Sequence, residues 1–292
     1  MTNEKQKVAG LSVFAAIFLT GIKLVMGIVT GSLGLLSEAL HSGLDLVAAV
    51  ITFFSVRISD NPPDKEHNYG HGKIENISAF LETILLFITC IWIIYEALHR
   101  LITGNINIEV SVWSYVVVII SILIDFTRSR ALSKVARKYN SQALEADALH
   151  FSTDIWSSLV VLLGLICANF GFFFADAVAA LMVAFIVIII SYRLGKRSIE
   201  VLLDYAPREK VSKIGSILNS LPEIDSFRNL KVRTAGADTF VSVIVTLNSQ
   251  LRLNYAHKIC DKVEKEICKE IDRCDVFVHV EPSFEKYFLK KL

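Results

Sequence analysis

Residues 35–50, LLSEALHSGLDLVAAV, place a histidine and an aspartate four positions apart inside an apolar run. The same pair recurs in residues 145–164, EADALHFSTDIWSSLVVLLG. The two pairs are His41 with Asp45 and His150 with Asp154. A spacing of four puts both side chains on one face of a helix, about 6 Å apart along its axis. Because ionisable groups inside a membrane helix are costly, we interpret two such pairs as functional.

The composition around these pairs indicates a membrane protein. The chain has 292 residues, of which 53% are hydrophobic and 20% are charged, and its formal net charge of +1 argues against binding to nucleic acid. Its mean hydropathy of +0.51 is high for a soluble domain. We predict spans long enough to cross a lipid bilayer at residues 8–29, 33–56, 74–98, 112–126, 148–170 and 174–194.

Basic residues predict the orientation of these spans. Lysines and arginines gather between the fourth and fifth spans, after the sixth span and before the first span. Since cytosolic loops carry the excess of positive charge, we expect both termini in the cytosol of a multi-pass protein, most readily one of the cell membrane.

The character of the chain changes after residue 206. Helical periodicity at 211–221 and 254–270 is interleaved with strand-like alternation at 228–233, 240–247 and 276–280. This αββαβ order is typical of a small α+β domain. The predicted fold class is therefore a mainly α membrane protein, with six transmembrane helices in a transport domain (residues 1–206) and a cytosolic α+β domain (207–292).

The two pairs offer two imidazole nitrogens and two carboxylate oxygens. If their helices pack together, this set suits a tetrahedral Zn²⁺ site, whereas more carboxylates would favour Mn²⁺ or Mg²⁺ and thiolates would favour Cu⁺. The ligands must lose protons to bind metal, and an unperturbed imidazole titrates near pH 6.5. Competition between metal and protons is a mechanism for antiport. The alternative is that each pair is an ordinary polar contact between packed helices.

Three stretches resemble the cation diffusion facilitator family of divalent-metal/proton antiporters. They are GSLGLLSEALHSGLD (31–45), DKEHNYGHGKIE (64–75) and EADALHFSTD (145–154). The resemblance covers almost the whole chain. It implies a homodimer that moves metal out of the cytosol by alternating access, with protons as counter-ion. It also implies that the transport ligands are His41, Asp45, His150 and Asp154, in the version similar to zinc-preferring members. Cd²⁺ remains open as a substrate, and Co²⁺, Ni²⁺ and Fe²⁺ are less expected.

The resemblance implies further groups on the cytosolic side. Asp64, His67 and His71 are spaced as in a second, peripheral metal site of some members, although a solvated loop would share this pattern. Lys73 and Asp204 match a charge pair between the two domains of relatives. The alternative for this pair is an ordinary interfacial contact, worth about 0–1 kcal/mol.

Some relatives also carry a two-metal site in the cytosolic domain. His257, His279 and Glu281 match that site, but Arg228 and Ile244 stand where the family would place histidines. We therefore expect no intact two-metal site and keep a single three-residue site as a hypothesis. The alternative is a dimerisation and regulatory domain whose polar residues are surface or interface groups.

Zinc/proton antiport is the function that these features favour, and we do not expect an enzyme. A membrane-anchored metal sensor is less favoured, because the better ligand set lies in the membrane spans. A passive channel is also less favoured, since conduction requires sites that an ion leaves quickly.

Overall fold

The computed structural model describes residues 2–30, 33–103, 112–169 and 174–283. The chain divides into two compact units, residues 1–199 and 200–292. The first unit is built from long helices and the second from helices and a small sheet. The predicted fold class, a mainly helical membrane domain followed by a small α+β domain, is confirmed.

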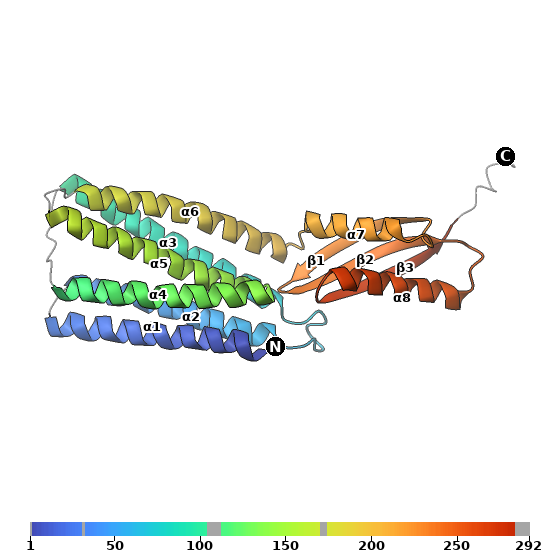
Figure 1. The fold of residues 1–292 in the computed structure, drawn as a ribbon, viewed down its shortest axis with the longest axis horizontal. Helices are drawn as coiled ribbons and strands as arrows, with labels where there is room; N and C mark the ends of the chain where they lie inside the picture. The colour runs from blue at the N-terminus through green and yellow to red at the C-terminus, as the bar shows by residue number, and fades with distance from the viewer. Residues whose placement is uncertain (1, 31–32, 104–111, 170–173, 284–292) are drawn as a thin grey trace. The chain divides into compact units, whose positions relative to one another are not determined.

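Six long helices run side by side in the first unit (Figure 1). They are α1 (Thr2–Thr30), α2 (Leu33–Ser59), α3 (Lys73–Thr103), α4 (Val112–Tyr139), α5 (Gln142–Asn169) and α6 (Phe174–Leu202). Their order follows the six predicted spans. The predicted end of the fifth span, at residue 170, lies outside the described residues.

Several helices extend past their apolar stretches. Helix α4 ends at Tyr139, whereas its predicted span ends at residue 126, and α5 begins at Gln142, before the predicted 148. Lysine, arginine, glutamine and glutamate are good helix formers, so the helical backbone continues where the apolar pattern stops. Hydropathy marks the part of a helix that suits a bilayer, and not the whole helix.

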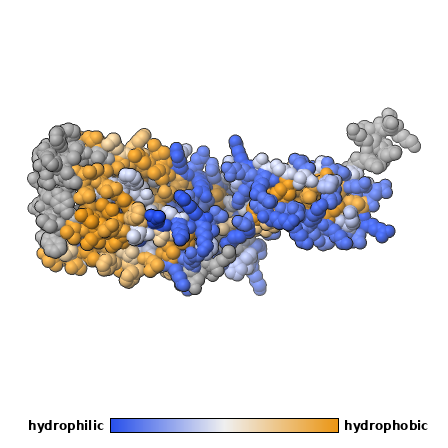
Figure 2. All heavy atoms as spheres, viewed as in Figure 1, coloured by the Kyte–Doolittle hydropathy of each residue, from blue (hydrophilic) through white to orange (hydrophobic). Residues whose placement is uncertain are grey.

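The surface of the first unit is largely apolar. Within the described residues, three helical segments have the length and composition to cross a membrane: Glu4–Val29, Ala39–Ser59 and Lys73–His99. Large side chains such as Phe14 and Trp92 are exposed. Figure 2 shows apolar residues over most of this unit and hydrophilic ones gathered at the end where the N-terminus lies. Such extensive apolar exposure fits a lipid environment.

Small residues bring the central helices together. Ala9 of α1, Ala49 of α2 and Ala143 of α5 are fully buried, and they belong to one apolar cluster that also includes α4. Alanine lets helix backbones approach closely in a membrane. Helix α5 contacts α2, α3 and α4, which places it in the middle of the unit. This packing carries the side chains of α2 and α5 toward each other.

The second unit has the predicted αββαβ order. It consists of α7 (Arg208–Ser220), β1 (Ser226–Ala235), β2 (Asp238–Leu247), α8 (Leu253–Glu270) and β3 (Cys274–Pro282). The strand order is β1-β2-β3, with β1 antiparallel and β3 parallel to β2. A tight turn joins β1 to β2, where Gly236 has a φ of 59°. A parallel neighbour requires a crossover, which α8 supplies.

The helices of this unit close its core against the sheet. Ile214 of α7 and Val263 of α8 are fully buried, and they pack with Val243 and Val245 of β2. Strand β1 begins two residues earlier than predicted and is irregular between Arg228 and Lys231. A bulge at such a point shifts the two-residue period of the strand.

Candidate metal-binding sites

The two His–Asp pairs face each other across helices α2 and α5. His150 Nε2 lies 3.0 Å from Asp45 Oδ1 and 3.7 Å from Asp154 Oδ2. His41 Nε2 lies 3.7 Å from Asp154 Oδ1 and 4.0 Å from Asp45 Oδ1. Each imidazole therefore lies near one carboxylate on its own helix and one on the opposite helix. We call these four residues the quartet.

The separations within the quartet fit one small cation. A tetrahedral ion with ligands at about 2.0 Å holds its ligand atoms about 3.3 Å apart. Ligand atoms of His41, Asp45 and Asp154 all lie within 4.8 Å of one another. Asp154 Oδ2 is buried and has no hydrogen-bond partner in the part of the chain that the structure describes. Buried carboxylate oxygens are normally paired, so this atom is a candidate ligand for a cation.

Exposure differs sharply within the quartet. The side chain of His150 is 2% exposed and that of Asp45 is 11% exposed, whereas His41 is 36% exposed. The set is thus enclosed on the α5 side and more open beside His41. Nearby, Lys23 of α1 is buried, and its Nζ donates a hydrogen bond to Ser42 Oγ at 2.8 Å. Lys23 stands out in the sequence because it lies well inside an apolar run. Its hydrogen bond to Ser42, on another helix, could not be predicted.

A buried polar chain lies beside the start of α5. Arg128 of α4 has Nη1 3.2 Å from Asp125 Oδ1, and its Nη2 donates to Ser12 Oγ at 3.0 Å. The Ser12 hydroxyl donates to Asp147 Oδ2 at 3.2 Å. The guanidinium also lies 3.5 Å from the ring centroid of Phe151. Asp147 is three residues before His150, so this chain ends one helical turn from the quartet.

A second polar cluster joins the helix ends at the N-terminal side of α3. Lys5 of α1 contacts the carboxylates of Asp60 and Glu75, at 2.5 Å and 3.1 Å. The hydroxyls of Ser59 and Ser141 donate to the two oxygens of Glu75. This cluster was not identified from the sequence, where Lys5 is one of several basic residues before the first apolar run.

The loop between α2 and α3 holds three candidate ligands together. Asp64 Oδ1 lies 3.3 Å from His67 Nδ1, and Asp64 Oδ2 lies 3.4 Å from His71 Nε2. The two imidazole rings are 4.5 Å apart between centroids. The backbone N–H groups of His67 and Glu66 donate to Asp64, and these bonds hold the pKa of this carboxyl below its usual range. The loop therefore offers an ionised carboxylate beside two imidazoles.

The turn in this loop requires a glycine. Gly70 has a φ of 74°, in the left-handed region that side chains rarely adopt, and its N–H donates to the carbonyl of His67 at 2.9 Å. The backbone reversal brings His71 back beside Asp64. The spacing Asp-x2-His-x3-His thus has a local structural cause.

The structure does not bring the three cytosolic candidates together. Within the described ranges, two groups offer at least three clustered ligands, the loop set and the set from the quartet, and His257, His279 and Glu281 are in neither. Glu281 instead accepts hydrogen bonds from Arg228 Nη2 at 2.5 and 2.7 Å, and these bonds lower the pKa of its carboxyl. The side chain of His257 is 76% exposed and lies 3.8 Å from Asp261.

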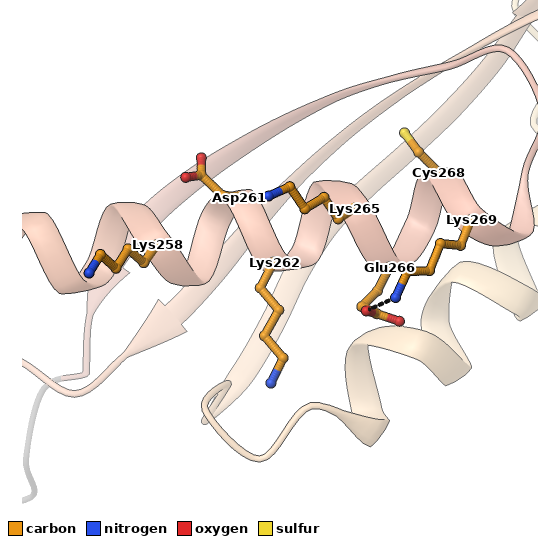
Figure 3. Close-up of a pocket in the computed structure, with 7 residues that line it drawn as sticks. All are labelled: Lys258, Asp261, Lys262, Lys265, Glu266, Cys268 and Lys269. Atoms are coloured by element: carbon orange, nitrogen blue, oxygen red, sulfur yellow. Dashed lines mark hydrogen bonds and ion pairs between the residues drawn. The ribbon is translucent and has the colours of Figure 1, made fainter.

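The second unit has a surface pocket whose lining does not resemble a metal site. Figure 3 shows it along α8. Its lining residues are Lys258, Asp261, Lys262, Lys265, Glu266, Cys268 and Lys269. Lys269 is paired with Glu266 at 2.5 Å, and Lys262 with Glu223 at 2.6 Å. Four lysines against two acids make this surface basic, which disfavours a divalent cation.

Two family models match the chain in succession. A cation efflux transmembrane domain matches residues 10–203, and the cytoplasmic domain of a cation efflux protein matches residues 206–283. A transporter of Methanocaldococcus jannaschii described as uncharacterised is 31% identical over 282 residues, covering 95% of this chain and 98% of that protein. The cation-efflux pump FieF of Yersinia enterocolitica is 30% identical, covering 95% of this chain and 93% of that protein.

Two further similarities extend the comparison. The magnetosome protein MamB of a Magnetospira species is 30% identical and covers 90% of both chains. The solved metal-bound C-terminal domain of the CzcD transporter from Thermotoga maritima is 25% identical, with a TM-score of 0.25. That likeness covers 25% of this chain and 87% of the solved one.

Proposed function

Because the chain belongs to the cation diffusion facilitator family of cation efflux transporters, we propose that it exports zinc from the cytosol in exchange for protons. Members of this family are membrane transporters of divalent metal cations, and not enzymes. The observation that carries the finer proposal is the meeting of two His–Asp pairs across α2 and α5, with His150 Nε2 3.0 Å from Asp45 Oδ1.

The four residues of the quartet are the proposed transport ligands. Two nitrogens and two oxygens support Zn²⁺, which takes such ligands in tetrahedral sites, and Cd²⁺ is the next candidate. Co²⁺, Ni²⁺ and Fe²⁺ are weaker candidates because the site has no feature that selects them. The loop set of Asp64, His67 and His71 is proposed as a second, peripheral site.

Proton exchange follows from the contacts of the imidazoles. A protonated imidazole is stabilised by the adjacent carboxylates, as His150 would be between Asp45 and Asp154. An arriving cation competes for the same nitrogen and oxygen atoms and displaces the protons. Zinc leaving the cytosol would in this way be exchanged for protons moving inward.

The proposed working form is a homodimer in the cell membrane that operates by alternating access, with both termini in the cytosol. The match of residues 206–283 supports the homodimer, because the matched family of cytoplasmic domains is a dimerising one. Basic residues at the ends of α4 and α6 support the orientation. Lys73 and Asp204 are proposed as the charge pair between the two units.

A membrane-anchored metal sensor is the second candidate function. It would need a metal site in the cytosolic unit, where His257, His279 and Glu281 are the candidates. Arg228 Nη2 donates to both oxygens of Glu281, so a metal ion there would have to displace this guanidinium. This competition makes the sensor the weaker proposal.

Calorimetric titration of the purified full-length protein with Zn²⁺, Cd²⁺ and Mn²⁺ tests the ligand assignment. An Asp64→Asn background removes one ligand of the loop set, so that the heats report on the quartet. We expect Zn²⁺ and Cd²⁺ to bind more tightly than Mn²⁺. Asp45→Asn should weaken zinc binding by at least about 10-fold, and His41→Asp should shift the preference toward Mn²⁺.

Asp272→Asn, in an exposed residue of the second unit, is the matched control and should leave the affinities unchanged. Unchanged zinc affinity in Asp45→Asn would refute the quartet as the binding site. An unchanged metal preference in His41→Asp would remove His41 from metal selection.

A further inference from the structure

Glu82 of α3 is a fully buried carboxyl group whose two oxygens have different surroundings. The hydroxyls of Thr52 and Ser78 both donate to Oε1. Oε2 is buried, and in the described ranges it has no hydrogen-bond partner. A carboxylate ion spreads its charge over both oxygens and needs donors at each. One oxygen with two donors and one with none matches a neutral acid, with the proton on Oε2.

Burial and the nearby carboxyl group of Asp147 favour the same protonation state, whereas His150 opposes it. Among the residues described, no lysine, arginine or histidine nitrogen lies within ion-pairing distance of its carboxyl group. The groups that act on it electrostatically are Asp147 and His150, both on α5. Helix α2 contributes the neutral Thr52. Helix α6 meets α3 at Gly195, and its neighbouring Lys196 is exposed.

Asp147 provides an internal comparison, because it is equally buried and its Oδ1 likewise has no hydrogen-bond partner in the described ranges, but its other oxygen is differently supported. Its Oδ2 accepts a hydrogen bond from Ser12, which in turn accepts one from Arg128. A guanidinium thus offsets the charge of Asp147 through a single hydroxyl. Glu82 has no such support. Since an uncompensated charge is costly in a membrane helix, Glu82 is the carboxyl group of the two that holds a proton.

The position of Glu82 connects it to the transport path. Helix α2 ends at Ser59, α3 begins at Lys73 and α5 begins at Gln142, so these three ends lie on one side of the unit. Glu82 is nine residues into α3, and its partner Thr52 is seven residues from Asp45 toward that same end. At 1.5 Å per residue, Thr52 is about 10 Å along the axis from Asp45. Glu82 therefore lies between the quartet and the helix ends that carry the basic residues.

We propose that Glu82 carries a proton of its own in each transport cycle, in addition to the protons of the quartet. This inference rests on the zinc/proton antiport proposed above. When a cation enters from the cytosolic side, the proton leaves Oε2 for cytosolic water, and the carboxylate charge that remains attracts the cation toward the quartet. When the cation has left outward, an incoming proton returns to Oε2. The proton released to the cytosol is thus replaced by one from the outer side, and Glu82 returns to its neutral form at the end of the cycle.

Counting the protons released when zinc binds tests this role. The purified full-length protein is mixed with Zn²⁺ in weak buffer, and a pH indicator reports the protons. Glu82→Gln keeps the shape and an acceptor for Thr52 and Ser78, but it has no proton to release. We expect it to release about one proton fewer per zinc than wild type, with zinc still bound at the quartet. Glu145→Gln, at an exposed carboxylate paired with Arg197, is the matched control and should release the wild-type number.

A second variant keeps the carboxyl group and changes its surroundings. Thr52→Val removes a hydroxyl that donates to Glu82 and preserves the shape of the side chain. Without that donor the ionised form is less stable, so proton release on zinc binding should move to higher pH. A structural role alone would leave the proton count and its pH dependence unchanged.

The outcomes separate this inference from the function on which it rests. Equal proton counts in wild type and Glu82→Gln, with an unchanged pH profile in Thr52→Val, would overturn the role of Glu82 and leave the antiport proposal standing. Zinc binding by wild type without any proton release would overturn proton coupling itself, and this inference with it.

Discussion

At the scale of single residues, Arg228 occupies the carboxylate that would otherwise be a candidate metal ligand in the second unit. Its guanidinium holds both oxygens of Glu281, and the pair shifts the pKa of each group toward its ionised form. The carboxylate therefore already has a cationic partner. In the first unit, by contrast, each histidine of the quartet lies near two carboxylates. Among the described residues, Asp154 Oδ2 has no hydrogen-bond partner. The two units thus differ in how readily their acids accept a metal ion.

Asp64→Asn tests the peripheral site at the same scale. The asparagine oxygen can accept the same backbone bonds from His67 and Glu66, so the loop should keep its turn while it loses the charge. We expect about one zinc fewer per protomer, because a neutral amide is a poor replacement for a carboxylate ligand. Elemental analysis of the desalted protein at pH 7 gives the count, and zinc flux should persist.

The control for this variant is Asp272→Asn, which should keep the wild-type zinc content. A full complement of zinc in Asp64→Asn would show that the loop is a solvated turn with no metal of its own.

The quartet could be predicted from the sequence because a spacing of four is a local property of a helix. The loop set was named by the family resemblance, and its three residues lie within eight positions. Burial of Lys5 and Arg128 could not be predicted, since their partners Glu75 and Ser12 come from other helices. The ion pair of Arg228 with Glu281 likewise depends on strand pairing across 53 positions.

At the scale of elements, the contact between α3 and α6 depends on one glycine. A Cβ atom placed on Gly195 would lie 2.8 Å from Thr83 Cγ2, closer than packed carbon atoms approach. The Thr83 side chain cannot turn away freely, because its hydroxyl donates to the carbonyl of Ala79 at 2.8 Å. The two helices can therefore approach this closely only because position 195 is a glycine, which has no side chain.

Gly195→Ala should weaken this contact. We expect a loss of about 1–3 kcal/mol in stability, which is the usual cost of overpacking. Thr83→Ser removes the clashing Cγ2 and leaves Cβ at 3.6 Å, so the double variant should recover most of the loss. Thermal unfolding of the purified protein in detergent measures all three variants. A Gly195→Ala protein as stable as wild type, or a double variant no better than the single one, would contradict the packing account.

Element types were predictable and element ends were less so. The period of two in residues 240–247 and the period of 3.6 in 254–270 follow from one-sided burial, and both elements form as expected. The ends of α4 and α5 lie beyond the apolar runs, because helix formation continues in polar residues. Strand β1 begins at Ser226, two residues before the predicted start, and its irregularity near Asn229 lies inside the predicted range.

At the scale of the whole molecule, the proposed charge pair of Lys73 and Asp204 would couple the membrane unit to the cytosolic unit. Asp204, the proposed partner of Lys73, lies 3.5 Å from Arg233 within its own unit. A cation is thus already close to Asp204, and Lys73 would compete with it. The family resemblance pointed to the pair of Lys73 with Asp204. Local sequence patterns do not show whether Asp204 contacts Lys73 or Arg233.

The charge pair predicts a specific reversal. Lys73→Asp alone should lower zinc flux roughly two- to fivefold, since an exposed ion pair is worth about 0–1 kcal/mol. Lys73→Asp combined with Asp204→Lys should restore the flux by reversing both charges. Flux in reconstituted vesicles is the measurement, with protein content matched. Full activity in Lys73→Asp alone would mean that the pairing does not matter.

Zinc uptake into proteoliposomes under an imposed pH gradient tests the central claim most directly. The full-length protein is reconstituted, zinc is added at the cytosolic face, and the vesicle interior is made acidic. We predict that wild type takes up zinc faster as the interior becomes more acidic, and that Asp45→Ala and Asp154→Ala both abolish this uptake. Transport by both variants at the wild-type rate, or uptake by wild type that does not respond to the gradient, would contradict the account.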